Sequence, residues 1–168
     1  MAPEALSRGR IIVPGTQHQL GMCGLFPPSS AQRRPVAAAG HILEAKACVP
    51  GLLWLSFGEL CAPDLPPAAL KALAAEHSLW VVDDVPPPGA VPSGVSRPGT
   101  WRCFADVLAA LAATNTALFL VAREVPRWLE AAAADPEAKE PLQRIDGMLA
   151  GLPLMESDVR LVEGISGS

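Results

Sequence analysis

The sequence predicts an α/β domain, because two apolar runs flank a strongly helical segment. Leu79–Val82 is a continuous apolar run, and Ala117–Ala122 is a second one. Runs of this kind are typical of central parallel strands, which are covered on both faces. Between them, Trp101–Ala113 has the apolar spacing of a helix that packs one face on a sheet. Strand, crossover helix and strand in this order form a right-handed βαβ unit, with the two runs paired in parallel.

Composition limits the chain to a small domain with irregular stretches. Its 168 residues suffice for one domain, and 50% hydrophobic residues supply a core. Eighteen prolines and 14 glycines predict long irregular segments beside that core. A net charge of −4 lacks the basic excess of a nucleic-acid binder, so we expect no nucleic-acid partner.

The N-terminal segment, residues 1–38, carries turn signals and no apolar period. Pro14-Gly15 and Pro27–Ser30 interrupt it, and we therefore expect it to be irregular and poorly ordered. Its four arginines against Glu4 resemble a mitochondrial presequence, although Pro and Gly break any amphipathic helix. Four scattered cysteines without a C-x-x-C pair indicate reduced thiols. We expect an intracellular protein, with mitochondrion and cytoplasm both open.

The region 39–157 contains the predicted fold. Gly40–Phe57 alternates weakly and predicts one or two strands, and Pro66-Pro67 opens a helix. Pro86–Gly99 is rich in Pro, Gly and Ser and predicts a mobile loop. Trp128–Ala134 and Lys139–Ala150 predict two C-terminal helices, and residues 158–168 a flexible tail.

No membrane-spanning segment is expected. The most apolar stretch, Val107–Ala122, is interrupted by Thr114-Asn115-Thr116, whereas a membrane helix needs about 20 predominantly apolar residues.

The strongest chemical signal is the pair Asp83-Asp84 after the first apolar run. Acids in this position hold Mg²⁺ in a Walker B strand, but acids that merely end a buried strand are the more common case. A nucleotide site also needs G-x-x-x-x-G-K-[ST], whose N–H groups and Lys hold the phosphates. None of the three lysines follows such a loop, and the sequence has no G-x-G-x-x-G after a strand, H-E-x-x-H or G-x-S-x-G. The residues alone nominate no catalytic group and no metal ligand.

Several short motifs occur in one order along residues 40–150. Gly40–Leu43 with Lys46–Cys48 is similar to G-R-x-[IL]…K-A-C, and Ser56–Cys61 matches [ST]-F-x-E-L-C. Asp84-Val85-Pro86 follows at ungapped spacing, Arg102-Cys103-Phe104 stands for R-R-F, and Leu142-Gln143-Arg144 for the start of F-Q-R-x-x-S-R. In this order they resemble the C-terminal third of the ZapE-type AAA+ ATPases, which include the mitochondrial LACE relatives. The residues that carry the resemblance are Phe57, Glu59, Leu60, Cys61, Val85, Pro86 and Phe104.

The resemblance implies part of a P-loop-NTPase-like (AAA+) sheet, with a βαβ unit and C-terminal helices. Full-length members bind ATP and Mg²⁺, hydrolyse ATP in an oligomeric ring, and act on protein partners in cell division or mitochondrial protein turnover. It makes Arg102, Arg144, Asp83 and Asp84 candidates for positions near a nucleotide. The alternative places both arginines on solvated helix faces.

The family's Walker A and Walker B segments are absent from this sequence, which looks like a truncated or degenerate copy. We therefore expect no ATP hydrolysis and no cofactor for this chain alone, with full-length relatives in a ring as candidate partners. The alternative is a non-catalytic α/β protein-interaction module, and a third reading is an unrelated small α/β binding domain.

Overall fold

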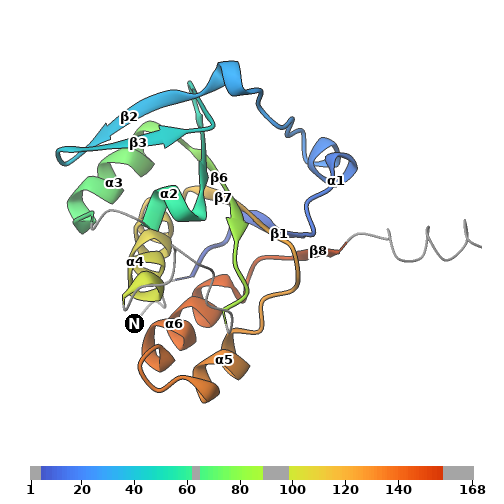
Figure 1. The fold of residues 1–168 in the computed structure, drawn as a ribbon, viewed down its shortest axis with the longest axis vertical. Coiled ribbons are helices and arrows are strands. Elements are labelled where there is room, and N and C mark those ends of the chain that lie inside the picture. Colours follow the sequence, from blue (N-terminus) through green and yellow to red (C-terminus); the bar gives the residue numbers. More distant parts are fainter. Residues whose placement is uncertain (1–4, 62–64, 89–98, 157–168) are drawn as a thin grey trace, which may run out of the picture.

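The computed structural model describes residues 5–61, 65–88 and 99–156, and a six-stranded sheet forms its centre (Figure 1). The strands lie in the order β4-β5-β6-β7-β1-β8. β4 and β5 pair antiparallel, and every other neighbouring pair is parallel. The strands of this sheet are β1 (Gly9–Val13), β4 (Ala47–Val49), β5 (Leu52–Ser56), β6 (Leu79–Val85), β7 (Ala117–Ala122) and β8 (Leu154–Glu156).

Most helices cover one face of the sheet, and the strand order explains why. The chain passes from β5 to β6, then β7, then past β1 to β8, always in the same direction across the sheet. Right-handed crossovers in one direction place their helices on one side. One apolar core accordingly joins the helices and the facing side of the strands. The helices are α2 (Phe57–Cys61), α3 (Pro67–Glu76), α4 (Thr100–Ala113), α5 (Trp128–Ala134) and α6 (Lys139–Leu149).

The opposite face has a thinner cover. From β1 the chain returns to the far edge strand β4, and only the first part of this connection covers this face: Leu20 and Leu25 belong to the apolar cluster here, whereas Val36, Ala38, Leu43 and Ala45 join the main core of the helical face. The connection contains α1 (Gln17–Met22) and a 3-10 turn (Ser30–Gln32), and then β2 (Arg34–Ala38) and β3 (His41–Ala45). β2 and β3 form a separate antiparallel hairpin that lies beside α2 and α3 in Figure 1. Beneath α1, a smaller apolar cluster is made of Ile12, Leu20, Leu25, Ala47, Trp54, Val81 and Val121.

An aromatic cluster links α2, α4 and α5 above the main core. The ring of Phe57 lies 5.2 Å from that of Trp101 and 5.1 Å from that of Phe104, centroid to centroid. Trp101 in turn lies 5.7 Å from Trp128 at the start of α5. Edge-on and tilted pairs at these separations add about 0.5–1.5 kcal/mol each beyond the burial of their area.

The predicted βαβ unit is confirmed. β6 and β7 pair in parallel, with Leu79 opposite Ala117 and Val82 opposite Leu120, and α4 connects them. The helices expected after Pro66, over Trp128–Ala134 and over Lys139–Ala150 are also present. Gly40–Phe57 holds three strands, β3, β4 and β5, rather than one or two. Residues 89–98 of the expected loop, and the expected tail 158–168, lie outside the described residues.

The expectation that residues 1–38 are irregular is wrong. This segment contains β1, α1 and β2, and β1 lies between β7 and β8 in the sheet. Ile12 is fully buried. A five-residue strand that begins at Gly9 and ends before Pro14 is too short to show a period, and its partners lie more than 100 positions further along the chain.

Candidate functional site

The carboxyl ends of β1, β6 and β7 meet at one edge of the sheet. The connections that follow the neighbouring strands β1 and β7 leave to opposite faces, and ligands of open α/β sheets bind at such a switch point. A cavity of about 260 Å³ lies there, which we call the switch-point cavity. It is lined by Pro14, Gly15, Leu20, Pro27, Pro28, Lys46, Trp54, Asp83, Asp84, Val121, Ala122 and Arg123.

One wall of the switch-point cavity is a network of charges. The Nζ of Lys46 lies 2.8 Å from Asp83 Oδ2 and 3.2 Å from Asp84 Oδ2. The indole Nε1 of Trp54 donates a second hydrogen bond to Asp83 Oδ2, at 2.8 Å. The other oxygen, Asp83 Oδ1, is buried and has no hydrogen-bond partner among the described residues. The network therefore ties β6 to the segment that joins β3 and β4.

The two carboxylates set the pKa of Lys46. Desolvation by burial lowers this pKa, but the hydrogen bonds and negative charges of Asp83 and Asp84 outweigh it. The net result is a pKa raised above 10.5, so Lys46 is a cation at neutral pH.

The turn from β1 into α1 uses its donors internally. Oε1 of Gln19 accepts from the backbone N–H groups of Gly15, at 2.9 Å, and Thr16, at 3.0 Å. Its Nε2 donates to the carbonyl of Val13 at 2.8 Å, and Gln19 is 3% exposed. In a phosphate-binding turn, backbone N–H groups point at the ligand instead. The N–H groups of Gly15 and Thr16 are therefore engaged within the turn itself.

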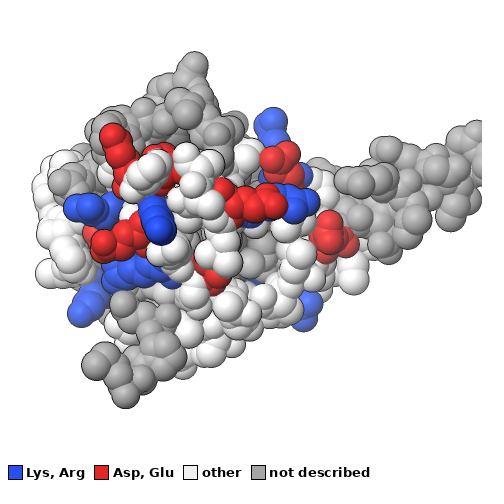
Figure 2. All heavy atoms as spheres, turned by 90° about the horizontal axis from the view of Figure 1, so that it is seen from below, with Lys and Arg blue, Asp and Glu red and all other residues white. Residues whose placement is uncertain are grey.

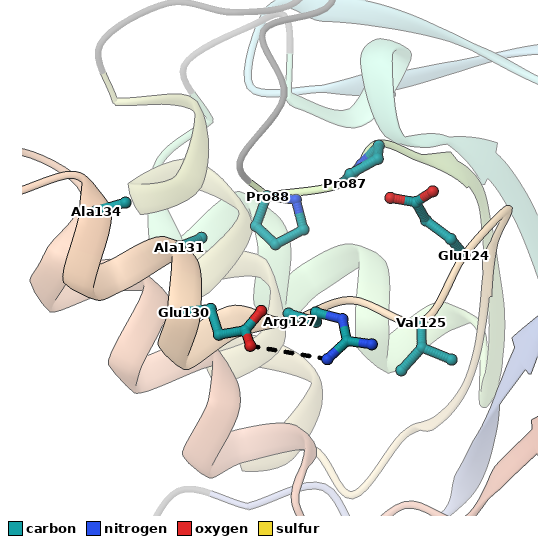
Figure 3. A pocket seen from close by; sticks show the side chains of 8 residues that line it. All are labelled: Pro87, Pro88, Glu124, Val125, Arg127, Glu130, Ala131 and Ala134. Carbon is teal, nitrogen blue, oxygen red and sulfur yellow. Dashed lines mark ion pairs between the residues drawn. The ribbon is translucent and has the colours of Figure 1, made fainter.

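A second hollow of about 440 Å³, the α5 groove, lies between the chain after β6, the chain after β7, and α5 (Figure 3). Figure 3 shows Glu124 across the groove from the Arg127–Glu130 ion pair, whose Nη1–Oε1 distance is 3.8 Å. The side chains of Arg127 and Glu130 are 72% and 71% exposed, so this ion pair contributes little to stability. The groove is lined by Pro87, Pro88, Glu124, Val125, Arg127, Glu130, Ala131 and Ala134.

The structure brings two of the four nucleotide-proximal candidates together. Asp83 and Asp84 line the switch-point cavity, whereas Arg102 and Arg144 line neither of the two hollows. Arg102 is exposed on the first turn of α4. Arg144 Nη1 lies 3.4 Å from Asp106 Oδ1 and joins α6 to α4. Both arginines thus lie at exposed positions of their helices.

The [ST]-F-x-E-L-C residues form the corner between β5 and α2. Ser56 Oγ accepts from the backbone N–H of Glu59 at 3.2 Å, which caps the first turn of α2. Glu59 Oε2 accepts from the backbone N–H of Glu44 at 3.0 Å and so holds β3 against α2. The motif therefore has a structural explanation.

The apolar residues that carry the resemblance belong to the core. Phe57, Leu60, Cys61, Val85 and Phe104 are all 3% exposed or less. Pro86, at the end of β6, is half-buried.

Sequence reasoning missed Lys46, Trp54, Gln19 and Arg123. Lys46 meets Asp83 across 37 positions, and no local pattern indicates such a pair. Cys48 and His77, which look isolated in the sequence, also meet: Cys48 Sγ lies 3.9 Å from His77 Nε2. Among the described residues, no group of three or more His, Cys, Asp and Glu side chains is arranged to hold a metal ion.

The surface around α5 and α6 carries both signs of charge. Figure 2, which views the molecule from the bottom of Figure 1, shows Lys and Arg interspersed with Asp and Glu. The described residues of this face form no extended basic patch of the kind that binds nucleic acid. In the described part of the chain, no helix has the length and apolar character to cross a bilayer. Comparison with protein-family models, curated proteins and solved structures found no match.

Proposed function

We propose that this chain is an AAA+-like α/β module, related to the C-terminal region of ZapE/LACE-type ATPases, that binds a protein partner and does not hydrolyse ATP by itself. The motif order along residues 40–150 supports the relationship. The partner class that the resemblance implies is a full-length ATPase of this kind, assembled in a ring.

One observation supports the proposed absence of ATP hydrolysis: hydrogen-bond donors at the carboxyl edge of the sheet are engaged within the protein. Gln19 accepts from the two N–H groups of the β1–α1 turn, and Asp83 and Asp84 accept from two of the three N–H groups of Lys46. Phosphoryl transfer in P-loop enzymes depends on free backbone donors, a lysine on the β- and γ-phosphates, and a Ser/Thr-bound Mg²⁺. This chain holds the corresponding groups for its own packing.

Magnitudes support the same conclusion. A single hydrogen bond to a charged group contributes about 1.5–3 kcal/mol. Micromolar affinity requires about 8 kcal/mol. An exposed arginine such as Arg102 therefore cannot hold a nucleotide alone.

The test of the catalytic half is ATP binding and turnover by the purified full chain with Mg²⁺. We expect no calorimetric signal of micromolar binding and no phosphate release above background. The variants Arg102→Ala and Asp83→Asn distinguish a real site from contamination. Turnover above background that falls in either variant would overturn the non-catalytic half.

The test of the partner half uses sedimentation. The chain is mixed with a full-length ZapE/LACE-type ATPase at micromolar concentration, with and without ATP. We expect co-sedimentation with the ring and a change in the ring's ATP turnover. Independent sedimentation and unchanged turnover would contradict the proposed partner.

The unrelated binding domain remains the second candidate. It is favoured by the structural use of the [ST]-F-x-E-L-C corner, because a corner of this kind serves any α/β fold.

A further inference from the structure

The walls of the switch-point cavity divide into an apolar part and a polar part. Leu20, Val121 and the prolines Pro14, Pro27 and Pro28 form apolar walls. Leu20 and Val121 also belong to the cluster beneath α1, so these walls are packed from behind. Ligand pockets commonly combine such walls with a few convergent polar groups.

The polar part has unused donors. The Lys46 ammonium has three N–H groups, and Asp83 and Asp84 accept two of them. The third has no acceptor among the described residues, and Arg123 forms no ion pair with any of them. Both side chains line the cavity.

Most carboxylate oxygens in this wall are engaged or out of reach; the exception is Asp84 Oδ1, which accepts no hydrogen bond from the described residues and belongs to a side chain that is 59% exposed. Asp83 Oδ2 accepts from both Lys46 and Trp54, and Asp84 Oδ2 accepts from Lys46. Asp83 Oδ1 is enclosed by protein atoms, so a molecule in the cavity does not contact it. The free N–H groups of Lys46 and Arg123 outnumber the one open carboxylate oxygen, so the group that complements this wall is an acceptor with negative charge.

The same wall limits that charge to one unit. Two aspartates lie beside the donors, so a dianion such as a phosphate monoester meets more repulsion than a carboxylate does. A guanidinium binds a carboxylate through two parallel hydrogen bonds, which fits Arg123. A volume of about 260 Å³ restricts the remainder to a short apolar body.

We propose that the switch-point cavity binds a small monocarboxylate, with its carboxylate on Arg123 and Lys46 and its apolar tail against Leu20 and Val121. This site goes beyond the proposed function and does not depend on it.

The experiment is a ¹H–¹⁵N NMR titration of the full chain with butyrate. We expect saturable shifts at the amides of Gly15 and of residues 121–123, with a Kd of about 1 mM or tighter. Butyramide has the same shape without the charge, and butylammonium reverses the charge. Both should bind at least about tenfold more weakly, as should inorganic phosphate.

Variants assign the binding to this site. Arg123→Gln should weaken butyrate binding about tenfold, and Arg123→Lys should recover part of the loss, since it restores the charge without the bidentate geometry. Arg102→Gln, on the exposed first turn of α4, is the matched control and should bind like the parent chain. Unweakened binding by Arg123→Gln, equal affinity for phosphate, or shifts scattered away from the cavity would each overturn the proposal.

Discussion

The Lys46 ammonium joins two carboxylates that lie 37 and 38 positions further along the chain. Its side chain is 25% exposed and that of Asp83 is 15% exposed, so the pair is screened less than a surface ion pair. Removal of the cation leaves a nearly buried carboxylate whose remaining donor is Trp54.

Lys46→Met should therefore destabilise the fold by about 1.5–3 kcal/mol at pH 7. Urea unfolding at equilibrium measures the change. Lys71→Met, on the exposed side of α3, is the control and should stay within about 0.5 kcal/mol. Equal effects of the two variants would contradict a structural role for Lys46.

The raised pKa of Lys46 fixes the pH dependence of this contribution. A lysine whose pKa is higher in the folded chain than in the unfolded chain stabilises the fold fully below the unfolded value, near 10.5. The stabilisation is lost as the pH rises through the folded pKa. The difference in unfolding free energy between the parent and Lys46→Met should thus be constant from pH 7 to about 10 and shrink above 10.5. A difference that instead grows above pH 10.5 would contradict a raised pKa of Lys46.

Substitutions at two glycines with positive φ distinguish the cost of backbone strain from the cost of a steric clash. A Cβ at Gly9 (φ +122°) would lie 1.8 Å from the carbonyl oxygen of Leu118, which is backbone and cannot move aside. A Cβ at Gly24 (φ +75°) meets no atom within 4 Å. Gly24→Ala should cost about 1–2 kcal/mol from conformation alone. Gly9→Ala should cost clearly more, since it also disrupts β1–β7 pairing. Thermal unfolding of the two variants measures the difference. Equal losses of stability would exclude the clash at Gly9.

At the scale of elements, the sequence predicts the helices and strands whose apolar pattern extends over enough residues to be recognised. α4 extends over 14 residues, and its neighbours β6 and β7 are continuous apolar runs, so pattern and structure agree. β1 has five residues, of which three are buried, and no period can emerge from so few. Its place is set by long-range pairing, which local propensity does not report.

Ile12→Ala tests the central position of β1. Ile12 is fully buried, and deletion of its side chain should cost about 2–5 kcal/mol. Ile42 in the β2–β3 hairpin is the matched control: it is 71% exposed, and Ile42→Ala should change stability by less than about 0.5 kcal/mol. Similar small losses in both variants would restore the expectation of an irregular N-terminal segment.

At the scale of the whole molecule, the candidate site was predictable in part. The strand-end position of Asp83 and Asp84 follows from the apolar run before them, because the carboxyl ends of parallel strands meet at one edge. Lys46 and Arg123 could not be assigned to the same cavity from the sequence, because that assignment requires the strand order. In the sheet, β1 lies beside β7, although the two strands are far apart along the chain. Arg102 and Arg144 were selected through a resemblance, and their side chains lie elsewhere.

The two faces of the sheet should nevertheless unfold together. The main core contains residues from Leu6 to Leu152, and β1 and β5–β7 contribute side chains both to it and to the smaller cluster beneath α1. Loss of either cluster exposes the strands that support the other, which favours a single transition. The indole N–H signals report each face separately: Trp54 lies beneath α1, and Trp101 lies in the aromatic cluster of the helical face. In a urea titration followed by ¹H–¹⁵N NMR, both signals should disappear with the same midpoint, and Ile12→Ala should lower both midpoints equally. A Trp54 signal that is lost at lower urea would show that the α1 cover opens independently of the helical face.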